Sequence, residues 1–300
     1  MGDLFKALSA GLARFVFAWL MPSIITTGLF VLAVLPSLRH GANVRMDSFV
    51  GVASFTMAVL TLSVVFAYSA RPIYQFLEGY TMPHWLARRL TRRMQRKYLR
   101  LKALSTVGGE NEKLLAGEEL KFFPETLELI MPTRLGNALK AMEGYGVSRF
   151  GLDSQTLWYE LQSAASERLR RDTDDAQGAV DFFISSVAHL SLLAVVSAGT
   201  FLVSHDPTTG SHYPTPALVA LAAVALVRPA YRQATMNVLE WRWAVQALVN
   251  TSRPALAQSL ALRWPPSHED ECEMWQSFSG LVHYGRRDFY GRLLDRHRAV

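Results

Sequence analysis

The stretch FFISSVAHLSLLAVVSAGTFLV, residues 182–203, decides the fold class of this chain. It contains one ionisable side chain, His189, among apolar and small residues. At a rise of about 1.5 Å per residue, a helix of this length crosses the hydrocarbon core of a bilayer, which is about 30 Å thick. A helix at the surface of a soluble core would instead carry a polar face. The stretch therefore predicts a membrane-spanning helix.

Three further segments carry a similar pattern. Residues 15–35 and 49–68 each lack a charged side chain and are long enough to cross a bilayer. Residues 213–227 are apolar over a shorter length before Arg228 and Pro229. They predict either a fourth crossing, with Arg228 reaching the interface, or a re-entrant helix. We expect an all-α integral membrane protein with four transmembrane helices and a helical cytoplasmic module.

The short loops predict the orientation, because Lys and Arg gather on the cytoplasmic side of a membrane protein. Residues 71–104 hold nine Lys and Arg against one acidic residue, and residues 205–216 hold none. Arg39 and Arg45 in the first outer loop are too few to reverse this bias. We expect a multi-pass protein of the bacterial plasma (inner) membrane with the N-terminus and the C-terminus in the cytoplasm. The first apolar run is expected to stay as a membrane helix, since it is too long for a signal peptide.

These assignments divide the chain into four segments. They are residues 1–70 with the N-terminal helix and the first two crossings, 71–180 as a cytoplasmic helical segment, 181–229 with the third and fourth crossings, and 230–300 with C-terminal cytoplasmic helices. The second segment divides again by charge, since residues 71–104 carry a net +8 and residues 105–180 a net −5. Gly108 and Gly109 mark the joint between these two parts.

Residues 85–104 predict a basic amphipathic helix. Apolar residues recur at helical spacing from Leu86 to Leu101, and the basic residues lie on the other side. Next to a membrane helix, this side suits either anionic lipid or the solvated face of a cytoplasmic bundle. No recognised nucleic-acid-binding fold accompanies it, so nucleic acid is not favoured as a partner. The expected lipid-contacting residues are Arg88, Arg89, Arg92, Arg93 and Arg96, with Arg100 on the same side.

Capping residues predict two further helices. Asp153 is a suitable N-cap for a helix that runs through Trp158 and Leu161. Ser267 and Asp270 have the spacing of a capping box, which predicts a helix over residues 268–284.

The sequence predicts no catalytic residue and no cofactor. It lacks the nucleophile elbow, the phosphate-binding loop, the dinucleotide fingerprint and the HExxH zinc motif. The densest group of possible ligands, HEDECE at residues 268–273, has no recognised metal spacing, and its acids suit a helix start, so no metal site is predicted. The lone Cys272 excludes an internal disulfide.

Several short motifs resemble those of a family of uncharacterised bacterial multi-pass inner-membrane proteins with a P-T-R-L-G-N motif in the cytoplasmic segment. The resemblance extends over roughly residues 71–285 and implies a shared membrane architecture without a known activity. The motifs that carry it are PTRLGN at 132–137, Tyr145, FGLD at 150–153, Trp158, LEGY at 77–80, Glu271 and Trp275.

The PTRLGN motif predicts a helix start with a polar face. Thr133 can cap a helix on which Arg134 and Asn137 are neighbours, and Gly136 allows another backbone to approach closely. The face is either an internal hinge, in which Arg134 pairs with Glu143 or Asp153, or a surface for a ligand or partner. The candidate residues are Arg134, Asn137, Glu143, Asp153 and Glu78.

We expect a membrane anchor or scaffold whose module docks a protein partner or another copy of the chain, with anionic lipid as a further contact. Aromatic residues of the C-terminal part are suitable anchors: Trp241, Trp243, Trp264, Trp275 and Phe278. The alternative is an oligomeric channel or membrane-disrupting effector, favoured by small residues in the third and fourth crossings. A membrane enzyme ranks third and requires Glu78, Arg134, Asn137 and Asp153 to line one pocket.

His189 is expected to face other helices, because a polar side chain in lipid is costly. Its role is either a hydrogen bond to a hydroxyl such as that of Thr61 or Ser63, or a group that lines an oligomeric pore.

Overall fold

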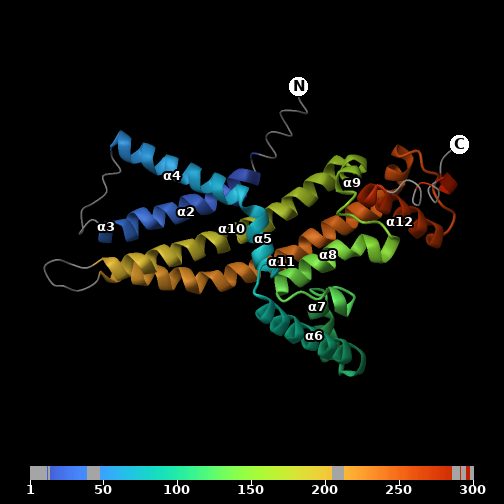
Figure 1. Cartoon of the computed structure of the whole chain (residues 1–300), viewed down its shortest axis with the longest axis horizontal. Helices are drawn as coiled ribbons and strands as arrows, with labels where there is room; N and C mark the ends of the chain where they lie inside the picture. Colours follow the sequence, from blue (N-terminus) through green and yellow to red (C-terminus); the bar gives the residue numbers. More distant parts are fainter. Residues whose placement is uncertain are drawn as a thin grey trace. The chain divides into compact units, whose positions relative to one another are not determined.

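The computed structural model describes residues 12, 14–38, 48–204, 213–285, 291 and 295–297. Within these ranges every regular element longer than one residue is a helix (Figure 1). The predicted all-α class is therefore confirmed. The two predicted outer loops fall largely on residues 39–47 and 205–212, which lie outside the described ranges.

The chain forms two compact units. The first, called here the membrane unit, comprises Met1–Phe76 and Gly178–Met236, and the second, called the helical module, comprises Leu77–Gln177 and Asn237–Val300. The chain passes between the two units inside helices rather than through long loops. The helices that contribute to both are α5 (Ala70–Glu78), α10 (Glu167–Val203) and α11 (Pro214–Ser259).

Four helices are long and apolar enough to cross a membrane, as predicted: Val16–Leu38, α4 (Phe49–Tyr68), α10 and α11. Most of α4 is exposed, and its exposed side chains are apolar except for the small hydroxyl side chains of Ser54, Thr56 and Thr61, with no charge along the whole length. A helix that faces lipid is apolar all round, whereas a soluble protein rarely exposes so long an apolar surface. The exposure of α4 is therefore the pattern of a membrane protein.

The third and fourth spanning helices extend farther than the predicted crossings. α10 begins at Glu167, well before Asp181. α11 continues without interruption through Pro229 to Ser259. The continuation is stabilised by an apolar face beyond the proline, on which Ala234, Val238, Val245 and Leu248 are buried.

The first span contains two prolines, and a π-helical turn precedes each. η1 (Val16–Leu20) leads into α2 (Met21–Leu29), and η2 (Phe30–Val34) leads into α3 (Leu35–Leu38). Met21 and Leu35, the residues before the prolines, each donate their N–H to a carbonyl five residues back. Proline lacks an N–H and its ring clashes with the preceding turn. The wider turns accommodate both rings without breaking the span.

Small residues bring the membrane helices together. Leu193 and Ala194 of α10 form a buried cluster with Ala223 of α11, and Phe30 of the first span packs against it.

The module consists of shorter helices. α6 (His84–Val107) and α7 (Glu110–Leu120) are joined at Gly108 and Gly109, as predicted. α12 agrees with the predicted helix at both ends, where the Asp270 N–H donates to Ser267 Oγ at 3.1 Å and Gly285 adopts a left-handed φ of 66°. The other elements are η3 (Leu127–Leu129), α8 (Arg134–Phe150), α9 (Trp158–Ala164), α12 (His268–Tyr284) and η5 (Asp295–His297).

A buried ion pair holds α12 against α11. Arg253 Nε donates to Glu271 Oε1 at 2.6 Å, and both side chains are about nine-tenths buried. Trp275 Nε1 donates to the same oxygen at 3.2 Å. The Arg253 guanidinium lies 3.2 Å from the centre of the Phe150 ring, at the end of α8. Three helices therefore meet at one charge pair, which we call the Glu271 lock.

Gly151 allows the end of α8 to lie directly against α12. Its φ is 69°, and a Cβ at this position would come within 2.5 Å of the Cys272 carbonyl oxygen. Any other residue would be strained here and would push α12 away.

Burial and the neighbouring Glu271 raise the pKa of the Cys272 thiol, which is therefore protonated at neutral pH.

We predict that Glu271→Gln destabilises the protein by about 3–5 kcal/mol, because Arg253 would remain buried without a negative partner. Glu273→Gln is the matched control, since Glu273 lies on the same helix and its carboxylate is half exposed. The control should cost less than about 1 kcal/mol. Thermal unfolding of the detergent-solubilised chain measures both effects, and equal losses would contradict the role of the lock.

Candidate functional site

The PTRLGN motif packs against the LEGY motif, which begins with the last two residues of α5. Thr133 Oγ1 donates to the Glu78 carbonyl at 3.0 Å and accepts the Gly136 N–H at 2.9 Å. A Cβ on Gly136 would come within 2.6 Å of the same Glu78 oxygen, and one on Gly79 within 2.3 Å of Pro132. The predicted cap at Thr133 is therefore present, and the two motifs form one close backbone junction.

Asn137 is fully buried and serves this junction. Its Oδ1 accepts the Met131 N–H at 2.8 Å, and its Nδ2 donates to the carbonyls of Met131 at 2.9 Å and Thr133 at 2.6 Å. These bonds satisfy both backbone polar groups of Met131, and the Thr133 carbonyl also accepts the Asn137 N–H of α8 at 3.1 Å. The Asn137 amide is therefore bonded to the backbone, as in the hinge alternative, and is not free to bind a ligand.

The partner of Arg134 differs from the prediction. Its Nη2 donates to Glu119 Oε1 at 2.7 Å, not to Glu143 or Asp153, and its guanidinium lies 4.2 Å from the centre of the Phe122 ring. Lys97 also binds Glu119, at 2.7 Å. Burial alone would raise the pKa of Glu119, but the bonds from Lys97 and Arg134 outweigh it and lower that pKa. Glu119 thus joins α6, α7 and α8.

Asp153 caps a turn rather than a helix. Its carboxylate accepts the N–H groups of Gln155 at 3.0 Å and Thr156 at 3.2 Å, and α9 begins only at Trp158. The prediction of a helix cap is therefore corrected, for the reason that Asp side chains also stabilise isolated turns. Asp153 follows the C-terminus of α8, and Arg134 lies at the N-terminus, about 25 Å away at 1.5 Å per residue. The predicted candidate residues therefore do not converge on one pocket.

A smaller charged cluster remains beside the junction. Lys140 Nζ binds Glu143 at 2.7 Å and lies 5.9 Å from the centre of the Tyr80 ring. Burial and the nearby Glu143 raise the pKa of Glu78 to about 7, although Lys140 opposes this. Burial lowers the pKa of Lys140, but its bonds to Glu143 and Tyr80 outweigh this and raise it. The cluster therefore contains a carboxyl group, that of Glu78, whose protonation state changes near neutral pH. The sequence indicated Glu78 and Glu143 but not Lys140.

In the membrane unit, His189 is almost completely buried, as predicted. Its Nδ1 lies 2.8 Å from the Ser185 carbonyl and its Nε2 lies 2.8 Å from Ser23 Oγ, while Phe66 stacks on the ring. The predicted partners Thr61 and Ser63 are thus replaced by Ser185, one turn earlier on α10, and Ser23 of the first span. Both ring nitrogens are satisfied without a charge partner.

Asp181 holds the other end of the same face of α10. It accepts hydrogen bonds from Arg14 Nη2 at 2.5 Å and Tyr74 Oη at 2.6 Å. Asp181, Ser185 and His189 follow one another at intervals of four residues, and therefore share one side of the helix. Polar contacts of this kind tie α10 to the first span and to α5.

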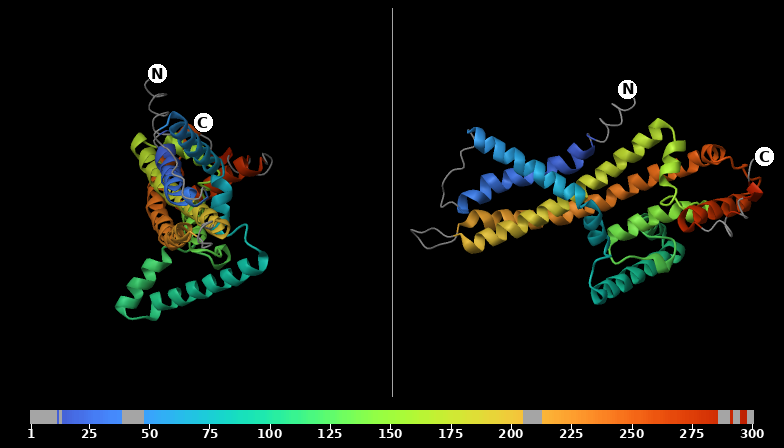
Figure 2. Two further views of the ribbon diagram at one scale, coloured as in Figure 1. Left: turned by 90° about the vertical axis from the view of Figure 1, so that its left-hand side faces the viewer. Right: turned by 45° about the horizontal axis from the view of Figure 1, so that its top comes forward.

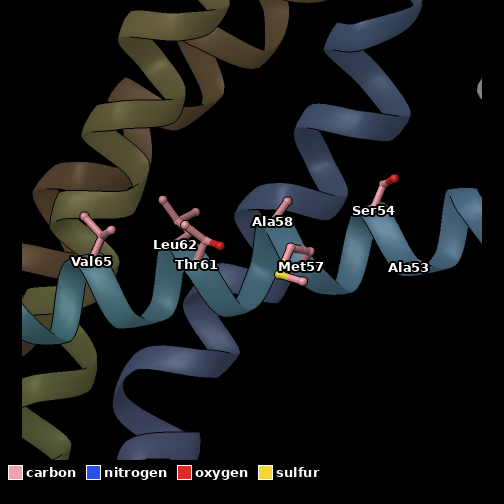
Figure 3. Close-up of a pocket in the computed structure, with 7 residues that line it drawn as sticks. All are labelled: Ala53, Ser54, Met57, Ala58, Thr61, Leu62 and Val65. Carbon is pink, nitrogen blue, oxygen red and sulfur yellow. The ribbon is translucent and has the colours of Figure 1, made fainter.

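The membrane unit also contains two hollows. A cavity of about 260 Å³ is lined by apolar side chains and two threonines: Thr26, Thr27, Phe30, Ala58, Leu62, Leu192, Leu193 and Val196. An open groove lies along α4 and is lined by that helix alone (Figure 3). Neither lining includes a charged side chain, so both surfaces suit acyl chains or a neighbouring helix.

The described residues define an all-helical protein with four potential membrane spans and a module held together by polar contacts. No protein-family model matches the sequence, and neither does any curated protein or solved structure. The motif residues that carry the family resemblance lie mainly in two places. These are the backbone junction between PTRLGN and LEGY, and the Glu271 lock.

We predict that Glu78 makes the stability of the module dependent on pH. Its pKa rises from 4.5 to about 7 on folding, so its contribution to stability is full below pH 4.5 and is lost as the pH rises through 7. Glu78→Gln cannot ionise. Between pH 5 and 8 the parent should lose about 1–2 kcal/mol relative to this variant, after allowance for solvent screening.

Thermal unfolding of both proteins across this pH range measures the difference. Glu118→Gln, at an exposed position on α7, provides the control. Parallel curves for the parent and Glu78→Gln would contradict the prediction.

Proposed function

We propose that this chain is a multi-pass protein of the bacterial inner membrane that acts as an anchor or scaffold. Four helices hold the module at the cytoplasmic face, and the module docks a protein partner or a second copy of the chain. The proposal includes membership of the inner-membrane family that the PTRLGN motif resembles. The size of the helical module supports the proposal, since its residues 77–177 and 237–300 together exceed half of the 300 residues.

The distribution of apolar side chains in the module carries the proposal. Of the expected anchors, Trp275 is fully buried within the Glu271 lock, but Trp243 is 55% exposed and Trp264 is 43% exposed. Leu114 and Leu115 of α7 are about two-thirds exposed. Large exposed apolar side chains on a module outside the membrane mark interaction surfaces.

The polar motifs support docking rather than catalysis. Arg134, Asn137 and Asp153 are bonded within the chain itself, and Arg134 and Asn137 lie at the N-terminal end of α8 whereas Asp153 follows its C-terminal end. A reaction requires polar groups that converge on a substrate. We therefore assign these residues to the rigidity of the module.

We predict that photo-crosslinkers placed at Trp243 or Leu115 of the full-length chain in native membranes give discrete products. A crosslinker at Glu240, an exposed polar position on α11, serves as the control and should give none. A product of about 67 kDa, twice the 33.5 kDa of one chain, indicates self-association, and any other mass indicates a partner. The same pattern from all three positions, or no product from any of them, would contradict the proposal.

The second candidate is an oligomeric channel or membrane-disrupting effector, and the uncovered face of α4 favours it. The groove on that face is lined mainly by small residues, among them Ala53, Ser54, Ala58 and Thr61. Small residues allow close packing between membrane helices, so a second copy is one way to cover this face.

Ion flux through reconstituted vesicles distinguishes the two candidates. The anchor predicts no flux above that of protein-free vesicles. A channel lined by His189 predicts flux that changes between pH 5 and 8, and that His189→Gln makes independent of pH.

A further inference from the structure

The outer side of α6 is a dense cationic surface. Six arginines of this helix are exposed: Arg88, Arg89, Arg92, Arg93, Arg96 and Arg100. Among the described residues none of the six forms an ion pair with an acidic side chain, and Arg96 reaches only the Arg92 carbonyl. Elsewhere in the module, basic residues such as Arg168 and Arg171 pair with acids on their own helix. The charge on α6 is therefore available to an external anion.

All six arginines share one side of the helix. At about 100° per residue they fall within an arc of roughly 140°. Exposed apolar residues occupy the same arc, since Trp85 is 70% exposed, Leu99 is 51% exposed and Val107 is 87% exposed. The surface therefore combines cationic groups with side chains that gain free energy on leaving water.

Contacts within the module fix the orientation of α6, so that its arginine side faces away from the module. The opposite side of α6 is fixed by Tyr98, which is buried and donates from Oη to the Glu125 carbonyl at 2.8 Å. Lys97 adds its bond to Glu119 of α7. Both views in Figure 2 show α6 at the edge of the module, beside α7. The arginine side is therefore presented outward by a fixed scaffold.

The chain also keeps α6 near the bilayer. Between Tyr68, the last residue of α4, and His84, the first of α6, nine residues are in α5. At 1.5 Å per helical residue and about 3.5 Å for each of the others, this connection spans at most about 40 Å. The start of α6, and with it Arg88 and Arg89, can therefore reach the leaflet at the end of α4.

We propose that the outer side of α6, from Trp85 to Val107, binds the phosphate headgroups of anionic lipid in that leaflet, with Trp85, Leu99 and Val107 entering the interface. The guanidinium groups of arginine can donate paired hydrogen bonds to phosphate oxygens. The apolar residues between the arginines suit the boundary between headgroups and acyl chains. A nucleic acid would use the charge but not the apolar residues. The inference rests on the proposed anchor function and names one surface that the module contacts.

The test uses the full-length chain in nanodiscs. A fluorophore is attached at Ala103→Cys, on the same side of α6, in a Cys272→Ser background, and nitroxide lipid quenches it from headgroup depth. We expect at least twofold stronger quenching with phosphatidylglycerol than in phosphatidylcholine alone. Raising the salt from 0.15 to 1 M should abolish the difference, because the Debye length falls from about 8 to 3 Å.

Charge variants then test the assignment. Arg88, Arg89, Arg92 and Arg93 changed together to Gln should remove the added quenching, whereas Arg168, Arg170, Arg171 and Lys113 changed to Gln should preserve it. Equal quenching in both lipids, or equal loss in both variants, would overturn the proposal. Tighter binding of a short RNA duplex than of anionic nanodiscs at 0.15 M salt would also overturn it and favour nucleic acid. If a charge variant does not fold, the salt titration on the labelled chain with all its arginines still tests the proposal.

No protein partner is present in the nanodiscs, so this result is independent of the crosslinking test. Lipid-dependent quenching without crosslinks would refute docking by the module and keep the lipid surface. Crosslinks without lipid-dependent quenching would refute the lipid surface alone.

Discussion

The absence of water in the bilayer core is the constraint on which the rest of this structure depends. Backbone groups there must be paired within helices, and charged side chains are costly, so long apolar helices are the available solution. The exposed apolar surface of α4 is favourable only under this constraint. Within the described membrane unit, polar side chains such as His189 and Asp181 are accordingly satisfied by other helices. The two π-helical turns keep the first span helical around its prolines.

In the helical module the same sequence uses polar groups in the opposite way. The module is held by contacts that a membrane interior would not favour: the amide of Asn137 on loop backbone, Glu119 between two cations, and Glu271 between Arg253 and Trp275. The buried Arg253–Glu271 pair adds little net stability, but the loss of either partner is severe. The contacts of the module account for most of the residues that the sequence motifs mark. Within the described part of the chain, the arginines of α6 remain as the main group of charged side chains without an ion pair.

The features that the sequence predicted well depend on local patterns. Continuous hydropathy predicted the four spans, and the capping box of Ser267 and Asp270 predicted α12. The failures depend on distance along the chain. Arg134 pairs with Glu119 and Arg253 with Glu271, and no periodicity indicates which of several acids a basic residue will meet. The partners of His189 were missed for the same reason. The sequence also did not predict that α10 begins at Glu167, because polar residues can continue a helix beyond its apolar part.

The account requires the module and the short loop between α10 and α11 to lie on opposite sides of the membrane. A reporter enzyme that is active only outside the cytoplasm tests this directly when it is inserted after Gly109, between α6 and α7, or after Gly210, a site outside the described residues. The account predicts activity from the Gly210 insertion and none from the Gly109 insertion. Activity at Gly109, or silence at Gly210 in a protein that is stably expressed, would contradict the four-span arrangement and the cytoplasmic module that depends on it.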